Sequence, residues 1–165
     1  DPSWSRGLGD VYKRQGKYKK KYKPSSEWRF HQDIYIKKKD AQAIVHTHST
    51  NATALSVHKK PIPAFHYMVA LAGGNDIKCA KYATYGTREL SKNILKALNN
   101  RKACLIANHG QIAFDSNLPD AFELAQEVEN LSLQYITALK LGKPKNLSDK
   151  EMNKVLKKAK NYKRD

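Results

Sequence analysis

The chain has 165 residues, room for one domain with its own core, and a net charge of +16. Nowhere does an uninterrupted apolar run approach the roughly 20 residues of a membrane helix, and the N-terminus lacks the apolar segment of a signal peptide. Two cysteines, Cys79 and Cys104, are too few for a disulfide scaffold or a four-cysteine zinc site. These features predict a cytoplasmic protein without a membrane partner.

The positive charge is concentrated at the two ends of the chain. Residues 1–24 and residues 143–165 each carry a net charge of +6, whereas the longer middle, 25–142, carries +4. Lysine-rich ends can bind nucleic acid without sequence preference, which makes a non-enzymatic basic binding module one hypothesis. The favoured interpretation is a lysine-rich solvated surface with no nucleic-acid partner.

Residues 1–23 differ from the rest of the chain. They show neither a helical nor a strand period, and residues 10–15 resemble the translation of a transposon end used in preparing sequencing libraries. We therefore predict a boundary at residue 24. Residues 1–23 form a disordered or artefactual N-terminus, and residues 24–165 form the domain.

Regular patterning begins at Pro24, and strands and helices then alternate, which predicts the α/β class. Pro24, Ser25 and Ser26 are expected to cap the first helix, and Ser148 with Glu151 forms a capping box for the last one. The predicted helices cover residues 28–39, 51–57, 67–71, 88–98, 122–141 and a segment after 148. The predicted strands cover residues 43–48, 77–80, 104–107 and 111–114.

His46 and His48 lie two residues apart on a predicted strand. Their side chains therefore leave the same face, with Cα atoms about 6.5–7 Å apart. Two imidazoles at this separation can converge on one metal ion. The alternative is a pair of hydrogen-bonded structural histidines.

His109 is a third candidate, because it lies between two predicted strands beside Gly110. Glycine at that position allows a close backbone approach or a positive φ. Three histidines with one open position are typical of a catalytic metal site, although spacing alone does not bring His109 to His46. Among the remaining histidines, His31 is expected to pack on its helix and His58 to lie on the surface. For His66, which precedes Tyr67 near a turn, a position lining a pocket is left open.

Glu27 is the carboxylate best placed to act as a base beside such a metal. It opens a helix directly after Ser25 and Ser26, where backbone N–H groups and the helix dipole favour anions. The same groups could bind a phosphate. A simple capping arrangement is the alternative.

Several separated motifs, in one order along the chain, resemble the class II L-fuculose-1-phosphate aldolases. The resemblance runs from Pro24 to about Tyr162. The motifs are PSSEWRFH (24–31), VHTH (45–48), IPAFHYM (62–68), AGGN (72–75), YATYGTREL (82–90) and NHG (108–110).

The resemblance implies a three-layer α/β/α sandwich with a mainly antiparallel central sheet. It also implies a homotetramer with one zinc ion per subunit, ligated by Glu27, His46, His48 and His109. Glu27 would act as the base and Tyr67 as the proton donor reaching a neighbouring subunit. The residues implied to bind substrate are Ser25, Ser26, Tyr85 and Tyr162.

The activity implied by the resemblance is that of an aldehyde-lyase of fucose metabolism. It cleaves L-fuculose 1-phosphate into dihydroxyacetone phosphate and L-lactaldehyde through a zinc-stabilised enediolate. The family's N-terminal region, which completes its phosphate site, is replaced here by residues 1–23, so full activity is expected of the intact parent protein. Alternatives within the superfamily are a deoxyribulose-phosphate aldolase, a pentulose-phosphate 4-epimerase and a methylthioribulose-phosphate dehydratase. The epimerases carry aspartate where Glu27 stands.

Overall fold

The computed structural model describes residues 25–162, with side chains through residue 159. Four strands form one sheet in the order β1-β4-β3-β2, and helices cover both of its faces. The strands are β1 (Ala43–Thr47), β2 (Cys79–Ala80), β3 (Ala103–Ile106) and β4 (Gly110–Asp115). The helices are α1 (Trp28–Lys37), α2 (Thr50–Ser56), the 3₁₀ helix η2 (Tyr67–Ala72), α3 (Arg88–Ala97), α4 (Leu118–Lys140) and α5 (Asp149–Tyr162).

The sheet is mainly antiparallel, as expected. β4 pairs antiparallel with both β1 and β3, whereas β2 joins β3 in parallel. The register places His46 opposite Ile112 and Thr47 opposite Gln111. The C-terminal end of β1, which carries His46, therefore lies directly beside the N-terminal end of β4.

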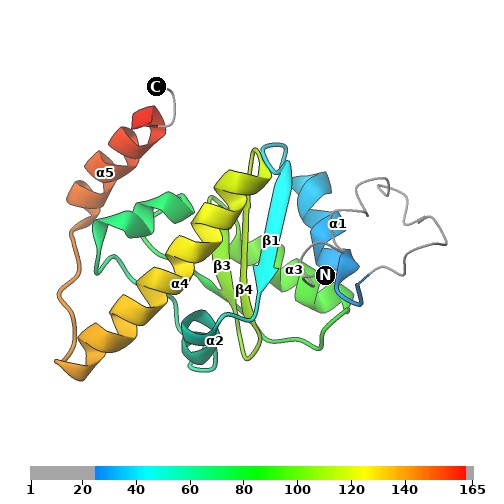
Figure 1. Ribbon diagram of the computed structural model, residues 1–165, viewed down its shortest axis with the longest axis horizontal. Helices are drawn as coiled ribbons and strands as arrows, with labels where there is room; N and C mark the ends of the chain where they lie inside the picture. The colour runs from blue at the N-terminus through cyan, green and yellow to red at the C-terminus, as the bar shows by residue number, and fades with distance from the viewer. Residues whose placement is uncertain (1–24, 163–165) are drawn as a thin grey trace.

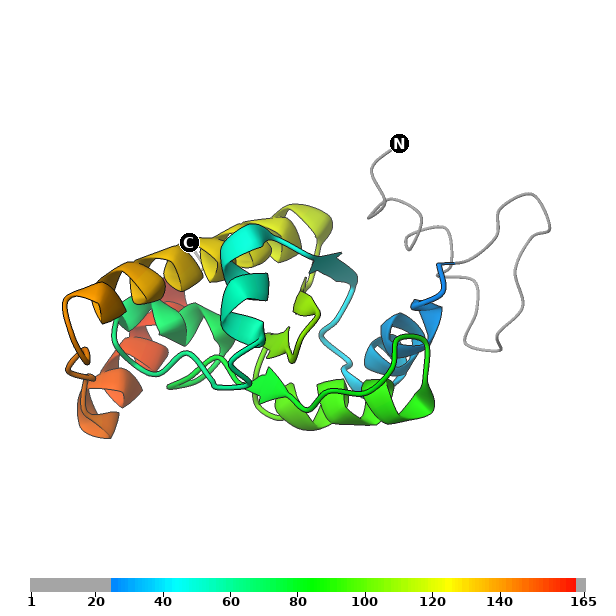
Figure 2. The ribbon, with the colours of Figure 1, turned by 90° about the horizontal axis from the view of Figure 1, so that it is seen from below.

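Two apolar clusters, one on each face of the sheet, form the core. Side chains alternate along a strand, so Ile44 joins the cluster formed with α1 and α3, whereas Val45 joins the cluster formed with α2, η2 and α4. Figure 2 shows the resulting layers, with α4 and α2 above the strands and α3 and α1 below them. The α/β/α sandwich expected from the sequence is confirmed.

The predicted elements are all present, with shifts of a few residues at their ends. The main difference lies at the start of α1, where neither serine caps the helix. Glu27 occupies the N-cap position without a side-chain cap bond, and Ser25 Oγ accepts a hydrogen bond from Glu27 N at 3.2 Å. At α5, by contrast, Ser148 Oγ accepts from Glu151 N as the capping box predicts. Among the described residues, no helix is long and apolar enough to cross a membrane.

His31 is half-buried on α1, where it lies against Phe30, which confirms that it packs on its helix. Its ring stacks on Phe30 at a centroid distance of 4.8 Å and lies 6.4 Å from the ring of His46. Burial, and secondarily the nearby His46, lowers the pKa of His31 to about 3. The imidazole is therefore neutral at pH 7.

We predict that Ile112→Ala lowers the free energy of unfolding by about 2–5 kcal/mol, because it leaves a cavity in the central strand. Ile112 is 0% exposed. Ile36→Ala is the matched control, since Ile36 on α1 is 47% exposed, and its effect should stay below about 1 kcal/mol. Urea denaturation of the metal-free proteins measures both changes. Equal losses in the two variants would contradict the core assignment.

We also predict that His31 makes stability depend on acid pH. Between pH 6.5 and about 3 the unfolded chain protonates His31 while the folded chain does not. The unfolded state therefore binds more protons, and the free energy of unfolding falls as the pH decreases, by up to about 1.4 kcal/mol per pH unit. Urea denaturation at stepped pH, with a chelator present, should give a shallower slope for His31→Gln than for the wild type.

The matched control for that comparison is His58→Gln, because His58 is exposed and water surrounds its side chain in both states. It should keep the wild-type slope. If His31→Gln also keeps that slope, the assignment of this pH dependence to His31 is wrong.

Candidate metal centre

Four side chains from three separate segments meet at one end of the sheet. Glu27 stands at the start of α1, His46 on β1, His48 just after β1, and His109 in the turn between β3 and β4. One potential ligand atom of each lies within 4.8 Å of the others. These four are the residues that the sequence analysis named as metal ligands, and the fold brings them together.

The strand period brings the first two histidines to the same side. His46 Nε2 lies 3.1 Å from His48 Nε2. His46 Nδ1 lies 2.7 Å from the carbonyl oxygen of Gln111, the residue paired with Thr47 on the neighbouring strand. Because a carbonyl oxygen only accepts, Nδ1 carries a hydrogen, and this bond holds the ring with Nε2 facing the cluster.

His109 reaches the cluster through a tight turn. Asn108 takes a left-handed conformation with φ of 54°, whereas Gly110, two residues later, does not. Gly110 is needed for space instead, because a Cβ there would lie 2.4 Å from the carbonyl oxygen of Thr47 and 3.2 Å from Cα of His48. Of the two roles expected for this glycine, the close backbone approach is the one found.

The Glu27 carboxylate turns away from its own helix and toward the histidines. Oε2 lies 3.1 Å from His46 Nε2, and Oε1 lies 2.9 Å from His109 Nε2. Burial alone would raise the pKa of Glu27, but the close contacts with His109 and His46 outweigh it and hold the pKa well below its usual range. The simple capping alternative is therefore wrong, and Glu27 presents an ionised carboxylate to the cluster.

The donor set fits a divalent metal ion. Burial, together with the neighbouring His46 and His109, lowers the pKa of His48, which favours the neutral ring that a metal needs. Glu27 Oε1 is buried, and its short contact with His109 lacks the geometry of a hydrogen bond. Imidazole nitrogens and a carboxylate oxygen are ligands typical of zinc and related transition metals.

Ser25, Ser26 and Tyr85 are the candidate substrate-binding residues near the start of α1. Ser25 and Ser26 precede Glu27 directly, and the turn after Tyr85 approaches them, since a Cβ at Gly86 would lie 2.9 Å from the carbonyl oxygen of Ser26. The Tyr85 side chain is 66% exposed. The turn after Tyr85 thus lies beside Ser26, the residue that precedes Glu27.

Tyr67 belongs to the other layer of the sandwich. It begins η2, which packs against α4 and α5, and its side chain is 54% exposed. His66 caps η2 by accepting a hydrogen bond from Met68 N at 3.4 Å, so it serves the local backbone. Tyr162 ends α5, and its side chain lies outside the described residues, as does the segment 1–23.

The polar side chains behind the histidines were not predicted from the sequence. Gln111 is 1% exposed, and its Nε2 donates to Ser49 Oγ at 3.0 Å and to the carbonyl oxygen of Ala125 at 2.9 Å. Glu129 on α4 accepts hydrogen bonds from the first turn of α2. A glutamine inside an otherwise apolar strand was the one sequence signal, because a buried amide needs partners.

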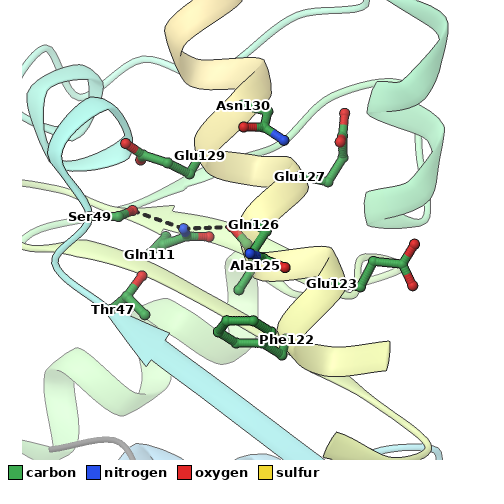
Figure 3. A pocket seen from close by; sticks show the side chains of 10 residues that line it. All are labelled: Thr47, Ser49, Gln111, Phe122, Glu123, Ala125, Gln126, Glu127, Glu129 and Asn130. Atoms are coloured by element: carbon green, nitrogen blue, oxygen red, sulfur yellow. Dashed lines mark hydrogen bonds between the residues drawn. The ribbon is translucent and has the colours of Figure 1, made fainter. Parts of the chain in front are cut away.

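An open cavity lies beside these polar side chains, on the α4 side of the sheet. It has a volume of about 460 Å³, and Figure 3 shows Thr47, Gln111 and Phe122 among its lining residues. Side chains alternate along β1, so the cavity that Thr47 lines is on the opposite face from His46 and His48. The cavity and the metal cluster are therefore two separate sites, on opposite faces of the sheet.

Known proteins with similar sequences are sugar-phosphate aldolases. The chain is 52% identical over 148 residues to an L-fuculose phosphate aldolase of Escherichia coli O6:H1, covering 89% of this chain and 69% of that protein. It is 51% identical over 148 residues to a 5-methylthioribulose-1-phosphate/5-deoxyribulose-1-phosphate aldolase of Rhodospirillum rubrum, covering 90% of this chain and 67% of that protein. The chain thus spans about two thirds of the length of these relatives.

The fold has a close counterpart among solved structures. An L-fuculose 1-phosphate aldolase superposes with a TM-score of 0.80 at 46% identity, over 83% of this chain and 64% of that one. The family model of the class II aldolase and adducin N-terminal domain matches residues 7–136. That match begins inside the segment 1–23, so the boundary at residue 24 stays a prediction. The match covers most of the chain, which therefore belongs to the class II aldolase and adducin family.

Proposed function

We propose that this chain is the catalytic part of a zinc-dependent aldolase that cleaves L-fuculose 1-phosphate into dihydroxyacetone phosphate and L-lactaldehyde. The observation that carries the proposal is the convergence of Glu27 with three histidines within 4.8 Å. The similarity to aldolases of phosphorylated sugars supports the substrate class. Since the chain spans about two thirds of these relatives, the activity is assigned to the protein of which it is part.

Zinc is the proposed ion, held by His46, His48, His109 and Glu27. When bound, it supplies a Lewis acid that polarises the ketone of the substrate. Three nitrogen donors and one carboxylate match the ligand set of catalytic zinc better than the all-oxygen sets of magnesium and calcium.

Glu27 is the proposed acid and base. Its carboxylate faces the cluster from the start of α1 and is ionised, so it can take a proton from the carbon beside the ketone in the aldol direction. In the cleavage direction the protonated carboxyl returns that proton to the carbon left carrying the electron pair. The backbone turn at Ser25 and Ser26 fixes the position from which it acts.

The remaining roles concern substrate binding and proton transfer at the aldehyde. Ser25 and Ser26, next to the start of α1, are proposed to bind the phosphate, since hydroxyls and helical N–H groups suit an anion. Tyr85 is proposed to place the aldehyde, and Tyr162 to close over the site. The exposed Tyr67 lies in the other layer, which suits a proton donor offered to a neighbouring subunit of a homotetramer. We place the enzyme in fucose metabolism in the cytoplasm.

We predict that the purified protein retains about one zinc ion per chain and that His46→Ala loses it together with cleavage activity. His46 is both a ligand and the residue whose Nδ1–H anchors the cluster to Gln111. Elemental analysis after dialysis, with a coupled assay for dihydroxyacetone phosphate, measures both properties. His58→Ala is the matched control and should keep both. Full zinc content and activity in His46→Ala would remove the metal claim.

A specific observation also favours 5-deoxyribulose 1-phosphate or 5-methylthioribulose 1-phosphate as substrates. The relative with that activity is as similar to this chain as the fuculose enzyme is, at 51% against 52% identity. Both reactions need the same base and ligands, so they differ in what surrounds the distal end of the sugar.

We predict a higher kcat/KM for L-fuculose 1-phosphate than for 5-deoxyribulose 1-phosphate, measured with the same coupled assay on the same enzyme sample. Ribulose 5-phosphate should be neither cleaved nor epimerised, because the epimerases are expected to carry aspartate in place of Glu27. The reverse preference between the two 1-phosphates would assign the second function. Epimerisation without cleavage would overturn both, and dehydration of methylthioribulose 1-phosphate without cleavage would do the same.

A further inference from the structure

A short helix, α2, connects two of the proposed metal ligands. It begins at Thr50, two residues after His48, and it ends at Ser56. Ser56 contacts the turn that carries His109, although the two are more than 50 residues apart in sequence. Hydrogen bonds from other segments hold both ends of α2. The catalytic and binding roles proposed above do not account for these bonds.

Glu129 holds the beginning of α2. The N-cap residue, Ser49, makes no side-chain cap bond, so the first N–H groups of the helix need another acceptor. Glu129 Oε1 accepts from Asn51 N at 2.8 Å and from Asn51 Nδ2 at 2.7 Å, and Oε2 accepts from Ala52 N at 2.8 Å. Figure 3 shows the carboxylate pointing from α4 toward this helix. A charged group on one helix thereby caps another.

The capping carboxylate is ionised at neutral pH. Burial raises the pKa of Glu129, but the hydrogen bonds from Asn51 N and Ala52 N outweigh it and lower the pKa below its usual value. Charge-assisted bonds of this length are about twice as strong as neutral ones. The start of α2, and with it the position of His48, is therefore firmly tied to α4.

Ser56 holds the other end. Its side chain is fully buried, its carbonyl oxygen accepts from Asn108 N at 3.2 Å, and its Oγ accepts from His109 N at 3.3 Å. The hydroxyl hydrogen is used inside the helix, where Oγ donates to the carbonyl oxygen of Thr53 at 2.8 Å. Oγ is thus oriented to accept from the His109 turn, in which Asn108 adopts its left-handed conformation.

We propose that α2 sets the distance between His48 and His109, with Glu129 and Ser56 as positioning residues at its two ends. The inference rests on the proposed function, because it gives both histidines a common ion to bind. A metal site binds tightly when its ligands are held in place before the ion arrives, and outer residues that orient ligands affect affinity strongly.

The test measures zinc affinity by competition with a chromogenic chelator, using the full chain. Glu129→Gln should weaken zinc binding about tenfold, and Ser56→Ala several-fold. The double variant should lose less than the product of the two single losses, because both act through one helix. Thermal unfolding of the metal-free proteins is measured in parallel, since a purely structural role would lower the midpoint without changing zinc affinity.

Two matched controls isolate the effect. Glu123→Gln removes a carboxylate from the exposed surface of α4, and Ser132→Ala removes a buried hydroxyl that donates within α4, to the carbonyl oxygen of Val128. Both should bind zinc within twofold of the wild type. If Ser56→Ala does not fold, Ser56→Cys keeps the shape of the side chain with a larger sulfur atom and weakens the acceptor.

Wild-type zinc affinity in both Glu129→Gln and Ser56→Ala would overturn the inference and leave the proposed function standing. An equal loss in the controls would also overturn it. A wild-type chain that binds no zinc would instead overturn the proposed function, and the inference would fall with it.

Discussion

The close approach of β4 to the end of β1 at Gly110 is the constraint on which the site depends. The carbonyl oxygen of Thr47 occupies the space where any other residue would carry its Cβ. This close approach, which only glycine permits, allows the turn bearing His109 to lie beside His46 and His48. The pairing of Thr47 with Gln111 then aligns the carbonyl that fixes the tautomer of His46. The backbone packing of β4 against the end of β1 thus brings the histidines together.

Much of this arrangement could be predicted from the sequence, because it depends on the alternation of side chains along a strand and on a short turn motif. The alternation along β1 placed His46 and His48 on one face, and the Asn-His-Gly turn marked His109. Glu27 was identified as an acid at a helix start, but its target could not be derived locally. The direction of its side chain depends on how α1 docks on the sheet, through contacts such as those of Phe30 and Ile34 in the core.

The polar groups behind the site could not be predicted for the same reason. Glu129 is one of several acids on an amphipathic helix, and nothing in its neighbours distinguishes it from Glu123. Its role appears only when α4 crosses the start of α2, 77 residues away in the chain. Ser56 likewise looks like an ordinary helix-end serine. Long-range hydrogen bonds of this kind leave no periodic pattern in the sequence. The ligands could therefore be predicted, whereas Glu129 and Ser56, which hold α2 in place, could not.

The antiparallel register between β1 and β4 also limits how the site can fail. Side chains on a strand alternate between faces, so a slip of β1 by one residue would turn His46 toward α4 and bring Thr47 to the face with Glu27. Such a slip would remove His46 from the metal cluster, whereas His48 follows β1 and lies beyond the paired residues. Correct pairing of β1 with β4 is therefore a condition for assembling the ligand set.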